Sequence, residues 1–108
     1  MTLIKEVDVM KGKFEALISQ DTPVLVDFYA DWCGPCQTME PVLKEVAQAF
    51  EGKIKIIKVD LDKNQPLAQK FGVRSIPAFI LFKNGKLVWQ KAGMQTIKAL
   101  SDLLAKEV

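Results

Sequence analysis

The chain contains only two cysteines, Cys33 and Cys36, and two residues separate them. Thiols at this spacing can join in a disulfide without a movement of the backbone, and a thiolate is the form that attacks another disulfide. The chain has no histidine, which excludes mechanisms that need an imidazole base or a histidine-ligated metal. We therefore expect thiol–disulfide exchange at this pair.

The pair follows a predicted strand at residues 24–30 and opens a predicted helix at residues 36–50, whose apolar residues recur every three or four positions. This places Cys33 at or near the helix cap and Cys36 one turn later, facing inward and less exposed. Unpaired backbone N–H groups and the helix dipole favour an anion at the first turn. We expect Cys33 to attack a partner's disulfide and Cys36 to resolve the mixed disulfide.

Three structural explanations compete with redox chemistry. A zinc site within one monomer would need two more ligands, and the chain offers neither a third cysteine nor a histidine. A purely structural disulfide around so small a loop would constrain the unfolded chain little. Two inert core cysteines are not expected where a helix begins after a strand. We therefore predict no metal site at the pair.

The neighbours of the cysteines have expected roles of their own. Pro35 is tolerated because early helical N–H groups need no partner, and its fixed φ stiffens the turn. Gly34 lets the backbone of another chain approach. Trp32 is either an ordinary surface residue or a flat apolar contact for a partner peptide, and the residue pattern favours neither.

Two charged residues interrupt predicted strands that are otherwise apolar, Asp27 within residues 24–30 and Lys58 within residues 54–59. Burial raises the pKa of an aspartate, so we interpret Asp27 as the proton acceptor for the resolving thiol. Alternatively, its side chain reaches a sheet edge or pairs with a lysine. Lys58 is the candidate partner, although a solvated lysine at a sheet edge fits the sequence equally well.

The order of elements indicates an α/β fold. Strands separated by helices pair in parallel, whereas a hairpin around Asn84-Gly85 is antiparallel. The result is a central mixed five-stranded sheet (βαβαβ then ββα) flanked by four helices. The expected strands are residues 3–7, 24–30, 54–59, 78–82 and 86–92, and the expected helices are residues 10–18, 36–50, 66–71 and 97–104.

Length and composition narrow the class of protein. The chain has 108 residues, of which 49% are hydrophobic and 26% charged, which fits one globular domain over residues 1–108. A net charge of +2 argues against nucleic-acid and membrane-surface binding. The longest apolar stretch, residues 76–82, is too short to cross a membrane, and Lys5, Glu6 and Asp8 lie where a signal peptide would be apolar. We expect a soluble and most simply cytoplasmic protein, with nothing that requires an oligomer.

Four segments, taken in order, carry a resemblance that covers essentially the whole chain: Val24-Leu25-Val26-Asp27-Phe28, Ala30-Asp31-Trp32-Cys33-Gly34-Pro35-Cys36, Ile76-Pro77 and Phe82-Lys83-Asn84-Gly85. A lone pair of cysteines at this spacing would be a modest signal, but the combination is highly specific. The chain resembles the thioredoxin family. The resemblance implies the thioredoxin fold, general reduction of protein disulfides without a bound cofactor, and recharging by an NADPH-dependent or ferredoxin-linked thioredoxin reductase.

The resemblance also implies roles for single residues. Cys33 becomes the nucleophile, Cys36 the resolver, Asp27 the buried acid–base residue and Lys58 its neighbour. The frequency of X-Pro bonds alone predicts a trans bond before Pro77, whereas the resemblance implies a cis proline beside the disulfide. The implied lining of the partner groove is Trp32, Gly34, Pro35, Ile76, Pro77 and Gly93, although Gly93 could simply end the last strand.

Three residues depart from the family pattern. Tyr29 stands where many members carry tryptophan, Ala78 where threonine is frequent, and Gln37 where a basic residue is common. None of these changes removes a thiol or the buried acid, so we expect them to affect partner choice and reducing strength. Gly34-Pro35 between the cysteines is typical of a reductant, since glutaredoxins carry Pro-Tyr and disulfide isomerases Gly-His.

Two other functions remain open at this point. A binding module would hold a partner in the same groove without turnover, and would show no dithiothreitol-driven insulin reduction above background. An oxidant or isomerase would have a strongly oxidising reduction potential when measured against glutathione.

Overall fold

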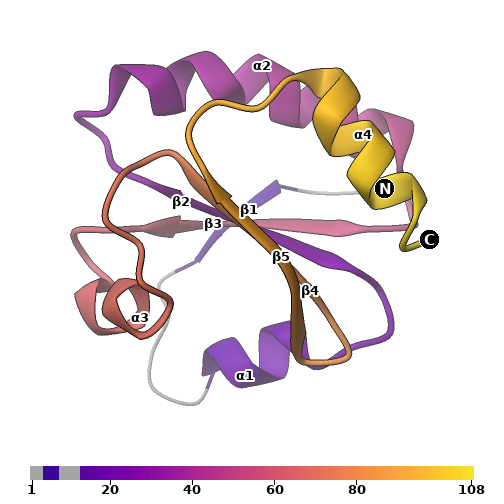
Figure 1. The fold of residues 1–108 in the computed structure, drawn as a ribbon, viewed down its shortest axis with the longest axis horizontal. Helices are drawn as coiled ribbons and strands as arrows, with labels where there is room; N and C mark the ends of the chain where they lie inside the picture. The colour runs from indigo at the N-terminus through magenta and orange to yellow at the C-terminus, as the bar shows by residue number, and fades with distance from the viewer. Residues whose placement is uncertain (1–3, 8–12) are drawn as a thin grey trace.

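A twisted sheet with helices on both faces forms the centre of the structure, a computed structural model that describes residues 4–7 and 13–108 (Figure 1). The strands are β1 (Ile4–Val7), β2 (Val24–Tyr29), β3 (Lys55–Asp60), β4 (Ala78–Lys83) and β5 (Lys86–Ala92). The helices are α1 (Lys13–Ile18), α2 (Gly34–Ala49), α3 (Gln65–Lys70) and α4 (Ile97–Ala105).

The strand order β1-β3-β2-β4-β5 places β2 at the centre of the sheet. Strands β1, β3 and β2 run parallel, and β4 pairs antiparallel with both β2 and β5. Strand β2 is buried along its whole length, as its continuous apolar sequence predicts. Its register places Asp27 between Lys58 on β3 and Phe79 on β4.

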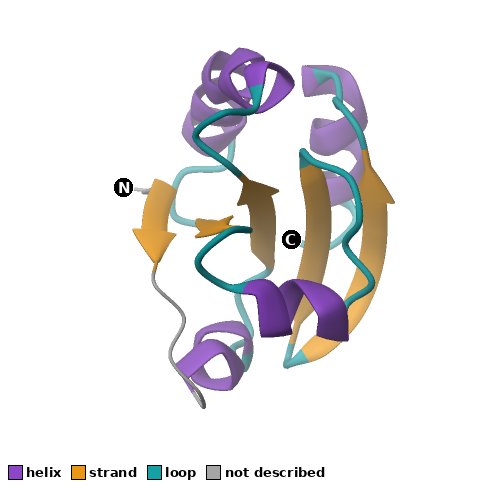
Figure 2. Ribbon diagram, turned by 90° about the vertical axis from the view of Figure 1, so that its left-hand side faces the viewer, coloured by secondary structure: helices purple, strands orange, loops and turns teal. Residues whose placement is uncertain are grey.

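Alternate residues of β2 contribute to two hydrophobic layers, one on each face of the sheet. Leu25 packs with Met39 and Leu43 of α2 and with Leu100 of α4. Val24, Val26 and Phe28 pack on the opposite face, with residues of α1 and α3. Figure 2 shows the two pairs of helices on opposite sides of the sheet. Asp27 therefore lies on the face that α2 covers.

The mixed five-stranded sheet and its four flanking helices confirm the predicted fold for the described part of the chain. Some boundaries differ by one or two residues, because α2 begins at Gly34 rather than Cys36 and β3 at Lys55 rather than Ile54. The hairpin turn lies at Asn84 and Gly85, both with positive φ, as the sequence predicts. Leu3 and the predicted helix start at residues 10–12 lie outside the described residues.

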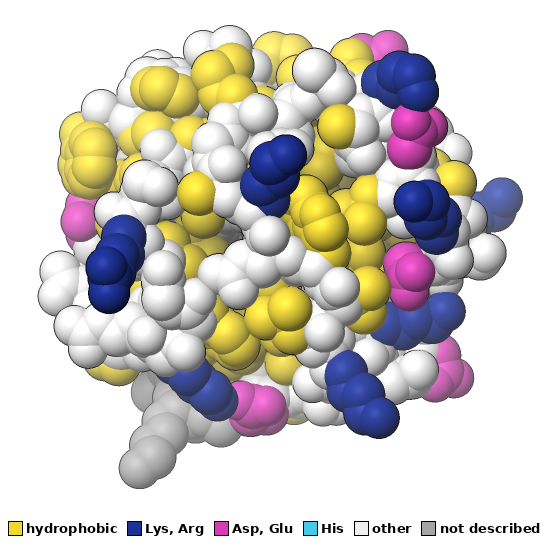
Figure 3. All heavy atoms as spheres, in the orientation of Figure 1, with side chains coloured by type: hydrophobic (Ala, Val, Ile, Leu, Met, Phe, Trp, Pro, Cys, Tyr) yellow, Lys and Arg dark blue, Asp and Glu magenta, His cyan; other side chains and the backbone are white. Residues whose placement is uncertain are grey.

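Most residues of edge strand β5 are exposed, including Leu87 and Val88. Figure 3, in the orientation of Figure 1, shows hydrophobic side chains interspersed with basic and acidic ones. Across residues 4–7 and 13–108, no helix has the length and apolar character needed to span a membrane.

Candidate active site

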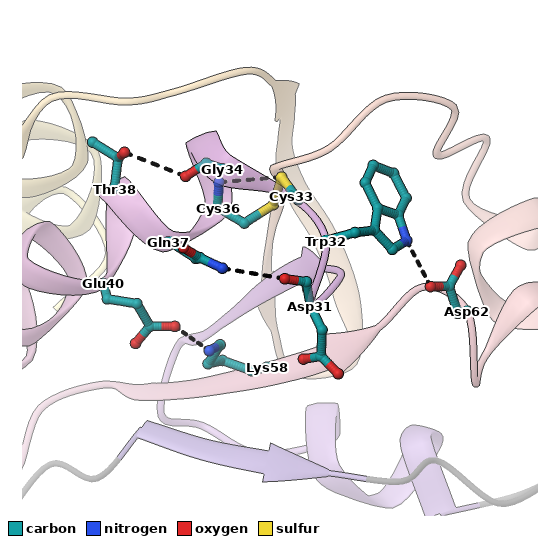
Figure 4. Close-up of a disulfide and its surroundings, with 10 residues drawn as sticks. All are labelled: Asp31, Trp32, Cys33, Gly34, Cys36, Gln37, Thr38, Glu40, Lys58 and Asp62. Carbon is teal, nitrogen blue, oxygen red and sulfur yellow. Dashed lines mark hydrogen bonds and ion pairs between the residues drawn. A yellow bond between two sulfur atoms is a disulfide. The ribbon is translucent and has the colours of Figure 1, made fainter.

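Cys33 and Cys36 form a disulfide at the start of α2, with their Cα atoms 5.3 Å apart (Figure 4). Cys33 is the N-cap residue, with extended backbone angles, as the sequence predicts. Its Sγ accepts a hydrogen bond of 3.1 Å from the backbone N–H of Cys36. The sulfur thus takes the place of the side-chain oxygen that usually caps a helix. A thiolate at Cys33 would receive the same N–H bond and the positive end of the helix dipole.

The disulfide lies in a small apolar cluster. Cys33 and Cys36 pack with Tyr29 and Ala30, and Ile76 contacts the cluster from the loop before β4. Each cysteine is 4% exposed, so the prediction that Cys36 is the more buried of the two is wrong for this disulfide form. The S–S bond holds both sulfurs in one cluster, so the same neighbouring residues shield both cysteines from solvent.

Asp27 is 1% exposed, and its Oδ1 has no hydrogen-bond partner among the residues that the structure describes. Burial raises the pKa of this carboxyl from 3.8 to about 7; the positive charge of Lys58 opposes the increase and the negative charge of Glu40 adds to it. The alternative in which Asp27 reaches a sheet edge is therefore wrong. An acid with this pKa exchanges its proton near neutral pH.

Lys58 connects this acid to helix α2. Its ammonium group forms an ion pair with Glu40 (Figure 4). The same group lies over the Tyr29 ring, 4.2 Å from the ring centroid. The Lys58 side chain is only 14% exposed, so it is not a solvated lysine at a sheet edge. The positive charge of Lys58 lowers the pKa of Asp27, which agrees with the predicted pairing of these two residues. The ion pair of Lys58, however, is made with Glu40.

Glu40 is one of the residues at this site that sequence reasoning missed. It follows Cys36 by four positions on α2, which places both on the same side of the helix. The four-residue spacing from Cys36 was the indication in the sequence that Glu40 lies near the cysteines. The spacing does not identify Lys58 as the partner of Glu40, because the contact joins a helix to a strand that is distant in the sequence.

Trp32 is 68% exposed, and its indole has a hydrogen-bond partner. The Nε1–H group donates a hydrogen bond of 2.8 Å to Asp62 Oδ2, in the loop that follows β3 (Figure 4). Gln37 donates from its side chain to the Asp31 carbonyl at 3.2 Å. These two hydrogen bonds connect the segment before the disulfide to α2 and to the β3–α3 loop.

The Ile76–Pro77 peptide bond is cis. The expectation of a trans bond from X-Pro frequencies is therefore wrong, and the expectation from the family resemblance is confirmed. The frequency describes local chain energetics averaged over many proteins, which do not decide the isomer of one bond in a folded chain.

Gly93 directly follows β5, so it does end the last strand. Its N–H group donates to the Pro77 carbonyl at 2.8 Å, and its φ of 95° is one that glycine adopts readily. At Gly34, a Cβ atom would have no neighbour within 4 Å among the described residues, which leaves open space beside the disulfide. The same part of the chain holds no group of three or more acidic or cysteine side chains placed to bind a metal ion.

The thioredoxin family model matches residues 5–106. The chain belongs to the thioredoxin family. It is 45% identical to thioredoxin 1 of Nostoc sp. over 87% of this chain and 88% of that protein. It is 43% identical to the thioredoxin of Pseudomonas aeruginosa over 91% of this chain and 92% of that protein. The crystal structure of thioredoxin from Trypanosoma brucei brucei superposes with a TM-score of 0.87 at 30% identity, covering 96% of this chain and 89% of that one.

Family membership and the disulfide at the start of α2 together define the activity. The protein is a thiol-disulfide oxidoreductase of the thioredoxin type, a dithiol that reduces disulfides. Thioredoxins act on disulfide substrates and are themselves reduced by thioredoxin reductase. With Cys33 and Cys36 joined in a disulfide, the structure represents the oxidised form.

Proposed function

We propose that Cys33 is the nucleophile and Cys36 the resolving thiol. The observation that supports this assignment is the position of Cys33 Sγ at the N-cap of α2, where it accepts the Cys36 N–H bond. Backbone dipoles at a helix start stabilise a negative sulfur at the N-cap more than a sulfur one turn further along the helix. Cys33 is thus the thiol that ionises first.

The reaction then proceeds in two exchanges. The Cys33 thiolate attacks one sulfur of a substrate disulfide, forms a mixed disulfide and releases the first substrate thiolate. Cys36 loses its proton and attacks Cys33 Sγ, which forms the Cys33–Cys36 disulfide and releases the second thiolate. Two electrons pass from the protein dithiol to the substrate, and the released thiolates take up protons.

Asp27 accepts the proton that Cys36 loses. A carboxyl that is buried beneath α2 and has an unpartnered oxygen is a base without a competing hydrogen bond at that atom. Its pKa of about 7 suits a group that must accept a proton and release it near neutral pH. Lys58, the register neighbour of Asp27 on β3, lowers the pKa of Asp27 through its positive charge.

The substrate chain binds beside the disulfide. The groove that we propose is lined by Trp32, Gly34, Pro35, Ile76, Pro77 and Gly93. The exposed Trp32 ring, the open space at Gly34 and the contact of Ile76 with the disulfide support this placement. Tyr29, Gln37 and Ala78, which depart from the family pattern, adjust the choice among protein clients.

We further propose that residues 1–108 act as one domain and as a monomer in the cytoplasm, with a thioredoxin reductase as the electron donor. The family's reliance on such a donor supports the last point.

Replacing Asp27 with asparagine should slow the resolving step, because the amide keeps the shape of the side chain but cannot accept the Cys36 proton. We expect the loss to be roughly a hundred-fold near neutral pH, at the low end of general-base effects. The measurement is a single-turnover reaction of the reduced protein with a peptide disulfide, quenched with acid and analysed for mixed disulfide between pH 6 and 9.

Asp31→Asn is the matched control, since Asp31 is an exposed carboxylate beside the cysteines. It should leave the resolving rate unchanged. An Asp27→Asn rate equal to that of the unmodified protein across the whole pH range would show that Asp27 is not the proton acceptor.

A further inference from the structure

Glu40 extends from α2 toward the sheet and contacts the ammonium group of Lys58 (Figure 4). The Glu40 side chain is 35% exposed, whereas the Lys58 side chain is 14% exposed. The ion pair therefore joins a group that water reaches to one that is largely buried. On the buried side, Lys58 is the register neighbour of Asp27.

The Lys58 ammonium contacts two groups directly, and two acidic residues hold register positions next to Lys58 in the sheet. Glu40 pairs with it from α2, and the Tyr29 ring on β2 lies 4.2 Å from it. Asp27 is next to Lys58 across the β2–β3 ladder, and Glu6 has the corresponding register position on β1. On the other side of Asp27, β4 presents the uncharged Phe79. Glu40 is thus the charged group through which α2 acts on this acid.

We propose that Glu40 is a positioning residue for the proton transfer: its carboxylate holds the Lys58 ammonium against Tyr29 and thereby sets how strongly Asp27 retains its proton. The proposal rests on the proposed role of Asp27 as proton acceptor. Glu40 takes no direct part in the exchange of the disulfide and acts through its ion pair with Lys58.

Two effects of Glu40 act in the same direction. The negative charge of Glu40 disfavours a second negative charge on Asp27. Its ion pair also neutralises much of the positive charge with which Lys58 stabilises the Asp27 carboxylate. Both effects are stronger than at the surface because Asp27 is shielded from water. Removing the Glu40 charge therefore leaves Lys58 free to stabilise the Asp27 carboxylate.

The test is Glu40→Gln, with the Asp27 carboxyl followed by carbon-13 NMR through a pH titration of the oxidised protein. We expect the pKa of Asp27 to decrease by roughly one unit, the lower end of the effect of a close opposite charge. The midpoint of the pH profile for the resolving step should move to lower pH by the same amount. A loss of structural support alone would not displace both midpoints together.

Glu45→Gln is the matched control, because it removes the same charge from an exposed position on the same helix. It should leave the pKa of Asp27 unchanged, since solvent and salt screen an exposed charge. The effect of Glu40→Gln should also become smaller when Lys58 is replaced by methionine, because the two residues act as a pair.

The proposal is wrong if Glu40→Gln leaves the pKa of Asp27 where it was, or moves it no more than Glu45→Gln does. This outcome differs from a failure of the proton-acceptor role. That role fails if Asp27→Asn leaves the resolving rate unaltered, whatever Glu40→Gln does to the titration of Asp27.

Discussion

Cys33→Ser should reduce the dithiothreitol-driven reduction of insulin to the uncatalysed background rate. The serine hydroxyl cannot form a disulfide with the substrate, so the first exchange does not take place. The fold should persist, since Cys33 contributes to a small cluster at the end of the sheet rather than to either main hydrophobic layer. Circular dichroism and thermal unfolding of the reduced proteins provide the check that the variant is folded.

Cys36→Ser is the paired variant and should fail at a different step. Cys33 remains able to attack, but the mixed disulfide has no resolving thiol and accumulates. Non-reducing gel electrophoresis should show a covalent adduct with insulin that dithiothreitol releases. Applied to a cell extract, the same variant would identify the protein clients directly.

Catalysis by Cys33→Ser above background would contradict the assignment of the nucleophile. A Cys36→Ser variant that forms no adduct would contradict the assignment of the resolver. If the unmodified protein itself showed no rate above background, the groove would be a binding site without turnover.

Asp27→Asn should increase the free energy of unfolding of the oxidised protein at alkaline pH by about 4 kcal/mol. The pKa of Asp27 is about 7 in the folded protein and 3.8 without burial. Each pKa unit corresponds to 1.36 kcal/mol, which gives the order of magnitude. Asparagine carries no charge at any pH, so it avoids this cost.

The sign follows from the protons bound in each state. Below about pH 4 both states hold the Asp27 proton, and the carboxyl makes no pH-dependent contribution. Between about pH 4 and pH 7 the unfolded chain has lost the proton while the folded protein keeps it, so this contribution to stability decreases as the pH rises. Above pH 7 Asp27 is ionised in the folded protein as well, and the full free-energy cost of burying its charge lowers the stability.

Urea unfolding of the two oxidised proteins at about pH 4 and about pH 8.5 measures the difference. The gain from Asp27→Asn should be large at the higher pH and small at the lower one, and Asp31→Asn should show no such trend. An equal gain at both pH values would mean that Asp27 has an ordinary carboxyl pKa in the folded protein.

Local patterns were sufficient to predict much of the fold and the core of the site. The apolar run of β2 required a central strand, and the helical spacing after Cys36 placed the thiols at a helix start. Asp27 was predicted to be buried because a strand with apolar residues on both sides leaves no polar face. Each of these inferences depends on neighbours within a few positions in the sequence.

Contacts between distant segments were not predictable in the same way. The ion pair of Lys58 with Glu40 and the hydrogen bond of Trp32 to Asp62 join elements whose relative positions follow only from the assembled layers. The cis bond before Pro77 contradicts the local preference of the chain and was implied by family resemblance alone. The equal exposure of the two cysteines reflects their bond rather than their positions along α2.

The rate at which iodoacetamide alkylates Cys33 in the reduced protein at acidic pH is the most direct measurement of the central claim. Alkylation requires the thiolate, and the helix start should maintain a fraction of Cys33 in that form where free cysteine is almost fully protonated. Peptide mapping after a timed quench should show Cys33 modified faster than free cysteine under the same conditions, with Cys36 slower. Alkylation of Cys33 no faster than that of free cysteine would contradict the account.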